Sequence, residues 1–290
     1  MLTQKEVVKL MAGIDTKVGL NNLIRIVNKL DDKGRTLILN ALNSQISDGT
    51  KQKVLVELRT HVSATDIEVR NWLVKGISTS YVLGANLAVK ELKSISFKTV
   101  AGMPPLTSIS VELLQSAPYL KPHLQAVNAL LSSAYLDFGN TMTGYVRGAE
   151  NILNDALKRQ IRSTIAEGRL EGSSVADIKK IVKSTIGDRG FTVLLDRGGR
   201  EWSLGNYSEM ITRTHLIKAN AEATINRASD FDVDIVEISS HGADDALCAD
   251  EEGKIYSISG KSENYEPLDG HEPPYHPACR HTCFLRPDLQ

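Results

Sequence analysis

Histidine and cysteine side chains gather near the C-terminal end of the sequence, where their types and spacing suit a metal ion. His276 and Cys279 are separated by two residues, so a short loop can bring an imidazole and a thiolate to one centre. Two further cysteines, Cys248 and Cys283, and the histidines His241 and His281 lie in the last fifty residues. We therefore expect a zinc site with the candidate ligands Cys248, His276, Cys279, His241 and Cys283.

The same side chains allow two other interpretations. Buried thiols and hydrogen-bonding imidazoles can simply hold a loop-rich segment together. Alternatively, Cys248 or Cys279 can act as a nucleophile with His276 or His241 as its base, although the sequence fixes no third group to orient that base. Three cysteines do not make a disulfide framework.

Acidic residues surround Cys248, but they do not follow the spacing of a calcium loop. The EF-hand pattern of alternating acidic residues followed by glycine is absent. We interpret these residues as a solvated acidic loop: Asp244, Asp245, Asp250, Glu251 and Glu252.

Charge is distributed unevenly along the 290 residues, although the formal net charge is only −1. Residues 1–100 hold 15 basic and 9 acidic residues, and residues 101–200 hold 12 and 9, which gives net charges of +6 and +3. Residues 201–290 hold 7 and 17, a net charge of −10. The basic part can contact nucleic-acid phosphates without sequence preference, since no helix-turn-helix, zinc-finger or RNA-binding signature is present.

The composition is that of a water-soluble, mostly helical protein. Hydrophobic residues make up 41% of the chain and aromatic residues only 5%, so the core must consist mainly of aliphatic side chains. No apolar stretch approaches the roughly 20 residues needed to span a bilayer, and no signal peptide begins the sequence. We expect folding in a reducing cytoplasm.

The elements that must position the C-terminal side chains are mainly helices. Residues 21–30 show helical apolar spacing, Asp31 to Gly34 predict a turn, and helix resumes at 36–42. Residues 65–95 predict a longer helix capped by Thr65, with Gly84 weakening its middle.

A segment rich in proline and glycine interrupts this pattern at residues 96–118. We place a boundary there, between a helical N-terminal region (1–118) that ends in this linker and a second domain (119–290). Further helices are predicted within 120–229: residues 120–167, a short helix beginning at Ser173 or Ser174, and residues 205–229.

The final part of the chain, residues 230–290, is predicted to hold strands and loops. β-branched residues at 233–238 indicate one strand, and residues 254–258 a second. The fold class is therefore α+β and predominantly α-helical, with a small C-terminal α+β domain containing a short antiparallel sheet.

Four motifs follow one another in the last hundred residues. They are Asp196-Arg197-Gly198-Gly199-Arg200-Glu201-Trp202, then Tyr207 to Thr214, then Ser239-Ser240-His241 with Cys248 and Glu252 to Gly260, and last Pro273 to His281. In this order they resemble the phage Mu F-like head morphogenesis family, of the phage minor capsid protein 2 type. The chain lacks the second cysteine that many relatives have shortly after the position of Cys248, so a four-cysteine metal site is not implied.

The resemblance implies a minor structural protein of a tailed-bacteriophage head. Such proteins lie inside the capsid near the portal, in several copies, and act in head assembly, DNA packaging or ejection. The expected partners are the portal protein, the major capsid protein and packaged double-stranded DNA, in the virion and in the host cytoplasm during assembly. We expect no enzymatic activity; the alternatives are a nuclease or transferase that uses the His/Cys cluster, and a non-specific DNA-binding packaging factor.

Overall fold

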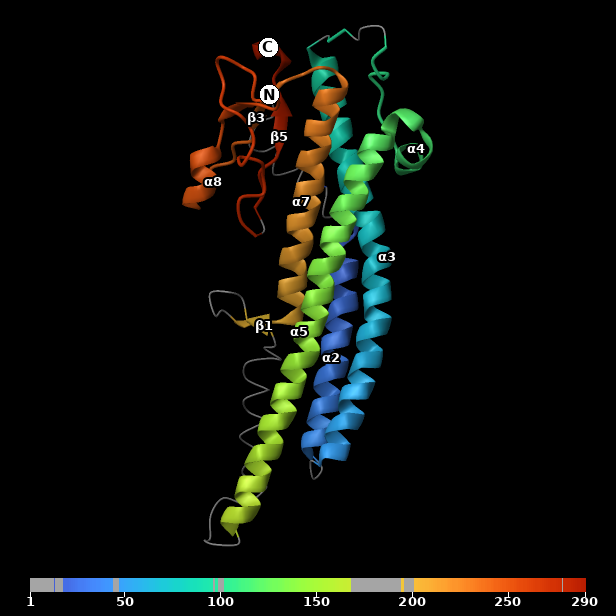
Figure 1. The fold of residues 1–290 in the computed structure, drawn as a ribbon, viewed down its shortest axis with the longest axis vertical. Coiled ribbons are helices and arrows are strands. Elements are labelled where there is room, and N and C mark those ends of the chain that lie inside the picture. The colour runs from blue at the N-terminus through green and yellow to red at the C-terminus, as the bar shows by residue number, and fades with distance from the viewer. Residues whose placement is uncertain are drawn as a thin grey trace. The chain divides into compact units, whose positions relative to one another are not determined.

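A computed structural model describes residues 13, 18–43, 47–95, 97–98, 102–167, 194–195, 201–277 and 279–290. Most of these residues are helical, as Figure 1 shows, and the expected helix-rich α+β class is confirmed. The α-helices are α2 (Leu20–Asn43), α3 (Asp48–Ser94), α4 (Val111–Ser116), α5 (Lys121–Glu167), α7 (Leu204–Asp230) and α8 (Ala246–Glu251). The 3₁₀ turns are η1 (Pro118–Leu120) and η2 (Pro287–Leu289).

Two small antiparallel sheets accompany the helices. Strands β1 (Leu194–Leu195) and β2 (Glu201–Trp202) pair with each other. Strands β3 (Ile235–Ile238), β4 (Ile255–Ser257) and β5 (Cys283–Leu285) form the second sheet, in the order β4-β3-β5. The sequence predicted β3 and β4, but β5 was not expected, because it lies in a tail that we read as loop.

The chain divides into two compact units that do not follow its order. The first unit comprises Met1–Asn21, Trp72–Ala134 and Met210–Gln290, and the second comprises Asn22–Asn71 and Tyr135–Glu209. The predicted boundary at residue 118 falls inside the first unit.

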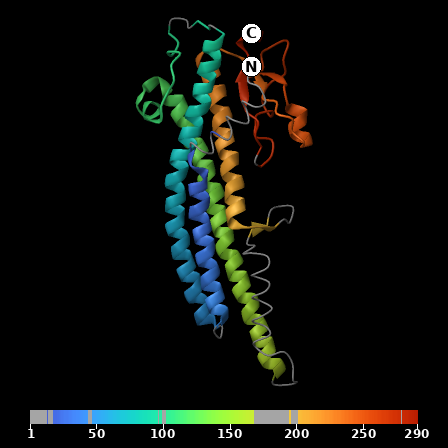
Figure 2. The ribbon, with the colours of Figure 1, turned by 180° about the vertical axis from the view of Figure 1, so that it is seen from behind.

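In the second unit, α2 runs beside parts of α3 and α5, as Figures 1 and 2 both show. Helix α2 continues through residues 31–34, so the predicted turn there is wrong. A Cβ atom on Gly34 would overlap the Tyr145 hydroxyl, and that hydroxyl lies 3.4 Å from the backbone oxygen of Asp31. Gly34 therefore does not end α2. Its missing side chain instead allows α5 to approach α2 closely.

Helix α3 also begins earlier than the sequence indicated. The predicted N-cap, Thr65, lies inside a helix that starts at Asp48, and the Ser47 hydroxyl accepts a hydrogen bond from the Thr50 amide at 3.1 Å. Leu55 and Leu58 are almost fully buried, so packing in the second unit stabilises the first turns of α3.

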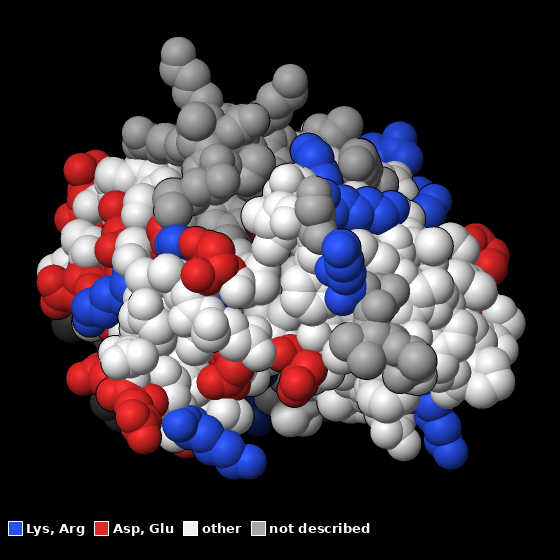
Figure 3. Space-filling view, turned by 90° about the horizontal axis from the view of Figure 1, so that it is seen from above, with Lys and Arg blue, Asp and Glu red and all other residues white. Residues whose placement is uncertain are grey.

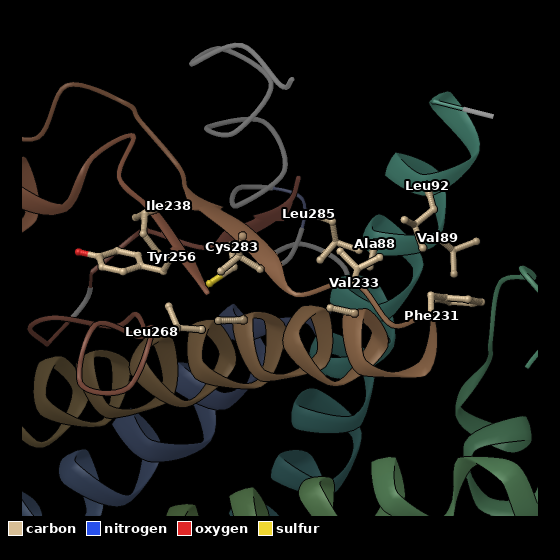
Figure 4. Close-up of a cluster of buried hydrophobic side chains, with 13 residues drawn as sticks. Ala88, Val89, Leu92, Phe231, Val233, Ile238, Tyr256, Leu268, Cys283 and Leu285 are labelled. Carbon is tan, nitrogen blue, oxygen red and sulfur yellow. The ribbon is translucent and has the colours of Figure 1, made fainter. Parts of the chain in front are cut away.

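The first unit has its own hydrophobic core between the three-stranded sheet and helices α3 and α7. Figure 4 shows side chains from the sheet, among them Cys283 and Leu285, lying against these helices. Gly84 is part of this packing, because a Cβ atom on it would overlap the backbone oxygen of Asn220 on α7. The cluster comprises Ala88, Val89, Leu92, Ala221, Ala228, Phe231, Val233, Val236, Ile238, Tyr256, Leu268, Cys283 and Leu285.

A buried polar network joins α3, α5 and α7 within the first unit. The Tyr81 hydroxyl lies 2.9 Å from His123 Nδ1, and His123 Nε2 lies 2.9 Å from an Asp230 carboxylate oxygen. The same oxygen accepts a hydrogen bond from Arg227, whose side chain is fully buried. Burial favours the neutral form of Asp230, but the hydrogen bonds from His123 and Arg227 outweigh it and lower the pKa of this carboxyl.

The proline- and glycine-containing segment is fixed to this network. The second terminal nitrogen of Arg227 lies 3.4 Å from the backbone oxygens of both Pro105 and Thr107. The Asn86 amide donates to the Ile109 oxygen and accepts from the Ile109 nitrogen. Residues 111–116 form helix α4 rather than linker.

Some predictions fall on residues that the structure does not describe, namely the helix from Ser173 or Ser174 and the turn at Gly198-Gly199. Among the helices that are described, none has a stretch long and apolar enough to cross a bilayer.

Candidate metal centre

Helix α8 positions the first candidate ligand, Cys248. The Asp245 carboxylate caps this short helix by accepting hydrogen bonds from the amides of Leu247 at 3.0 Å and Cys248 at 3.4 Å. The Cys248 side chain is buried, with 2% of its surface exposed. The cap thus fixes the backbone that directs the Cys248 thiol into the protein.

The segment before β5 supplies two more of the predicted ligands. Cys279 is buried, and its sulfur lies 3.7 Å from the sulfur of Cys248. One ligand atom each from Cys248, His276 and Cys279 lie within 4.8 Å of one another. The structure therefore brings together three of the five side chains that the sequence proposed.

The fourth, His241, belongs to a neighbouring group with Glu252 and His281, whose ligand atoms also lie within 4.8 Å of one another. The rings of His241 and His281 have centroids 4.1 Å apart. His281 Nε2 is 3.2 Å from Glu252 Oε1, and His241 Nδ1 is 3.8 Å from the same oxygen.

His281 connects the two groups. Its Nδ1 lies 3.4 Å from the Cys279 sulfur, while its Nε2 faces Glu252. The backbone nitrogen of His281 also donates to the Cys279 sulfur at 3.4 Å. A fully buried imidazole thus presents one nitrogen to the thiols and the other to a carboxylate.

Backbone amides hold that carboxylate in place. Glu252 Oε1 accepts hydrogen bonds from the amides of His241 at 2.9 Å and Ala243 at 3.0 Å, and Oε2 accepts one from Gly242 at 3.1 Å. Partial burial acts to raise the pKa of Glu252, but these hydrogen bonds outweigh it and lower the pKa below the ordinary value. Glu252 is therefore a fixed negative charge beside His281.

Burial disfavours the charged forms of both Cys248 and His281. It raises the pKa of the Cys248 thiol to about 12, with Cys279 and nearby acids adding to the effect. It lowers the pKa of His281, and the neighbouring His241 contributes to that decrease. Without a metal ion the cluster holds a neutral thiol and a neutral imidazole at neutral pH, which disfavours Cys248 as a nucleophile.

Cys283, the fifth predicted ligand, is placed elsewhere. It lies on β5 in the hydrophobic core of the first unit, fully buried, as Figure 4 shows. Burial raises the pKa of its thiol to about 12. Among the described residues it belongs to neither group of candidate ligands, and it packs as a small apolar side chain.

A family profile described as phage minor capsid protein 2 matches residues 107–284, more than half of the chain. The chain belongs to this family. The resemblance seen in the sequence is therefore confirmed, and the protein is a bacteriophage minor capsid protein. No curated protein and no solved structure matches the chain significantly.

The family match includes the whole candidate centre of this minor capsid protein. It begins just before α4, covers α5 and α7, and reaches β5, so it spans both groups of candidate ligands.

The acidic residues near Cys248 in the minor capsid protein have structural partners. Glu251 accepts a hydrogen bond from the Tyr256 hydroxyl at 2.6 Å and lies 3.2 Å from His271 Nδ1 and from Lys254 Nζ. Glu252 accepts hydrogen bonds from three amides, so the prediction of a solvated loop is wrong for Glu251 and Glu252, whereas Asp245 caps α8 and is exposed. Figure 3 shows other acidic side chains on the surface, on the side where the C-terminal segments lie in Figure 1.

The five ligands predicted from the sequence did not include Glu252 or His281. For His281 a signal was present, because it stands two residues after Cys279 in a segment already identified as ligand-rich. For Glu252 no local signal exists, since its carboxylate contacts a histidine 29 residues later in the chain.

Proposed function

We propose that this minor capsid protein is a structural component of a tailed-bacteriophage head, located inside the capsid near the portal. There it acts in head assembly, and in packaging or ejecting the DNA. The observation that carries the proposal is the family match, which covers α5, α7 and the C-terminal sheet together. A component of this kind is made in the host cytoplasm and enters the head as it forms.

Localisation tests the proposal directly. Purified virions are compared with lysate by quantitative mass spectrometry, which should find the protein in mature heads in several copies per particle. Expression of the gene in infected cells without any protein in purified virions would contradict a structural role.

The expected neighbours are the portal protein and the major capsid protein. Chemical cross-linking of intact virions, followed by mass spectrometry, should join lysines of this chain to portal peptides more often than to major capsid peptides. Cross-links spread evenly over the major capsid protein would argue against a location near the portal.

Packaged double-stranded DNA is the third proposed partner. The net charge of +9 over residues 1–200 supports non-specific contact with phosphates. Affinity for duplex DNA should then fall steeply with salt and should be similar for unrelated sequences. Affinity that is insensitive to salt would remove DNA from the set of partners.

A catalytic role for the His/Cys cluster is not proposed. A cysteine nucleophile needs an accessible thiolate, whereas burial raises the pKa of the Cys248 thiol and Cys279 is only 1% exposed. The arrangement of these side chains supports a structural role.

A further inference from the structure

We propose that the first unit binds one zinc ion through four side chains of the C-terminal cluster. The ligands are the sulfurs of Cys248 and Cys279, Nδ1 of His281, and one ring nitrogen of His276. The site goes beyond the role in the phage head, because it concerns how the domain is held together.

Two of the separations between ligand atoms fit a tetrahedral zinc ion. Two thiolates at about 2.3 Å from zinc are about 3.8 Å apart in a tetrahedron, and the sulfurs of Cys248 and Cys279 are 3.7 Å apart. A thiolate and an imidazole nitrogen at about 2.0–2.1 Å from zinc are about 3.5 Å apart, and the Cys279 sulfur lies 3.4 Å from His281 Nδ1. Both separations match a shared metal ion.

Glu252 orients His281 for this role. Imidazoles that bind metals through one nitrogen usually donate the other N–H to a carboxylate or carbonyl, which fixes the tautomer. His281 Nε2 faces Glu252 Oε1 at 3.2 Å, so its Nδ1 is left with a lone pair directed at the thiols. Three amides hold Glu252, so we assign it as a positioning residue rather than a ligand.

Charge and burial also favour a closed zinc site. The two thiolates balance the charge of the ion once each has released its proton, and Cys248, Cys279 and His281 are at least 98% buried. Thiolate and imidazole ligands select zinc over magnesium or calcium. Four protein ligands leave no open position for a reacting water, which is typical of a structural site.

The proposed ion would join α8 to the segment that enters β5. Cys248 lies on α8, whereas Cys279 and His281 lie just before β5. Without the metal, the contacts between α8 and this segment at the cluster include the approach of the two sulfurs and the contact of His281 with Glu252, which directly follows α8. Zinc would therefore stabilise the sheet against loss of its last strand.

Metal analysis of the full-length protein, purified with reductant and without chelator, tests the proposal. The wild-type protein should hold about one zinc per chain. Cys248→Ala, Cys279→Ala and His281→Ala should each abolish zinc retention through gel filtration. Cys283→Ala should keep about one zinc, because Cys283 lies in the core away from the cluster.

Cobalt(II) substitution provides a readout that does not depend on stability. The wild-type and Cys283→Ala proteins should show thiolate-to-cobalt charge transfer and the intense d–d bands of tetrahedral coordination. His276→Ala should retain cobalt with weaker affinity, because water can take the place of this most exposed ligand. An unchanged affinity would exclude His276 from the ligand set.

Glu252→Gln and His241→Ala separate the proposal from a site at the neighbouring group. Glu252→Gln should weaken metal affinity by about 10–100-fold while the cobalt spectrum keeps its tetrahedral thiolate form. His241→Ala should retain one zinc. The proposal is overturned if the wild-type protein, folded by circular dichroism, binds no zinc. It is equally overturned if the double variant Cys248→Ala/Cys279→Ala keeps the metal while His241→Ala loses it.

Discussion

Charged side chains buried in the first unit depend on partners supplied by other parts of the chain. Arg227 is fully buried, pairs with Asp230, lies over the Phe231 ring, and contacts backbone oxygens of residues 105 and 107. Burying a charged group costs free energy, and its pairing roughly offsets that cost, so the intact pair adds little to stability. Removing one partner leaves the other charge uncompensated and is strongly destabilising.

Replacing Arg227 with alanine should destabilise the protein by about 3–5 kcal/mol, because it empties a fully buried site and leaves the partly buried Asp230 without the arginine of its ion pair. Urea denaturation followed by circular dichroism measures the change. Arg70→Ala is the matched control, since Arg70 also forms an ion pair with an acid on its own helix but is 43% exposed, and should cost about 1 kcal/mol or less. Equal losses for the two variants would contradict this view of the network.

Glu91 should make stability decrease as pH rises. Burial raises its pKa from 4.5 to about 8, against the hydrogen bond that its carboxylate accepts from the Leu285 amide at 3.1 Å. The folded protein therefore keeps a proton that the unfolded chain has lost, so the stabilisation is complete below pH 4.5 and disappears as pH rises towards 8.

Glu91→Gln removes this titration but keeps an oxygen for the Leu285 amide. The wild-type protein should lose stability relative to the variant between pH 5 and 8, by up to about 1.4 kcal/mol per pH unit. Urea denaturation of both proteins at several pH values measures the difference, in which the shared effects of other groups cancel. Parallel stability curves would show that Glu91 is ionised in the folded protein.

Residue types predicted part of the candidate centre. Cys248, His276 and Cys279 were identified because ligand chemistry is visible in residue type and short spacing. The positions of Cys283 and Glu252 could not be predicted, since one depends on the pairing of β5 and the other on a contact across 29 residues.

At the level of elements, the helices are longer than their local sequence signals suggest. Helices α2 and α3 run through Gly34 and Thr65, where the sequence predicted a turn and a cap. Local propensity favours an interruption at these positions, but each helix gains more by packing against its neighbours than it loses at one residue. Helices α5 and α7 were predicted closely because apolar side chains recur at helical spacing along both, even though α5 contains glycines such as Gly139.

Gly84 allows two helices of the first unit to meet, so an alanine there should be destabilising. Gly84→Ala would force its Cβ into the Asn220 backbone on α7, and we expect a loss of about 1–3 kcal/mol or more. Gly139→Ala on α5 is the matched control, because nothing lies within 4 Å of its added Cβ. That variant should gain about 0.5–1 kcal/mol from helix propensity alone.

Thermal and urea unfolding of both glycine variants measure these opposite effects. Stabilisation by both substitutions would mean that α3 and α7 do not approach each other as closely as the structure indicates.

At the scale of the whole molecule, each compact unit is assembled from separate stretches of the sequence. Helices α3, α5 and α7 each contribute residues to both units. A boundary placed by composition, such as the one predicted at residue 118, marks a change in local sequence. It cannot report which distant segments pack together, because that depends on long-range contacts.

Removal of zinc should therefore affect the two units differently. Hydrogen exchange measured after chelation should increase in residues 245–252 and 276–285, which surround the proposed ion, and should change little in α2, which belongs to the second unit. Cys248→Ala should show the same profile without chelator, and chelator should then add nothing. A uniform increase over both units would contradict a local role for the metal.

The position of β5 has a consequence for folding while the protein is being synthesised. The central strand β3 is made about fifty residues before its partner β5, and the core remains open on that side until residues 283–285 have left the ribosome. A chain whose translation stops earlier carries an unpaired strand edge and exposed apolar side chains. Chains that end before β5 should therefore be cleaved by proteases more readily than chains that contain it.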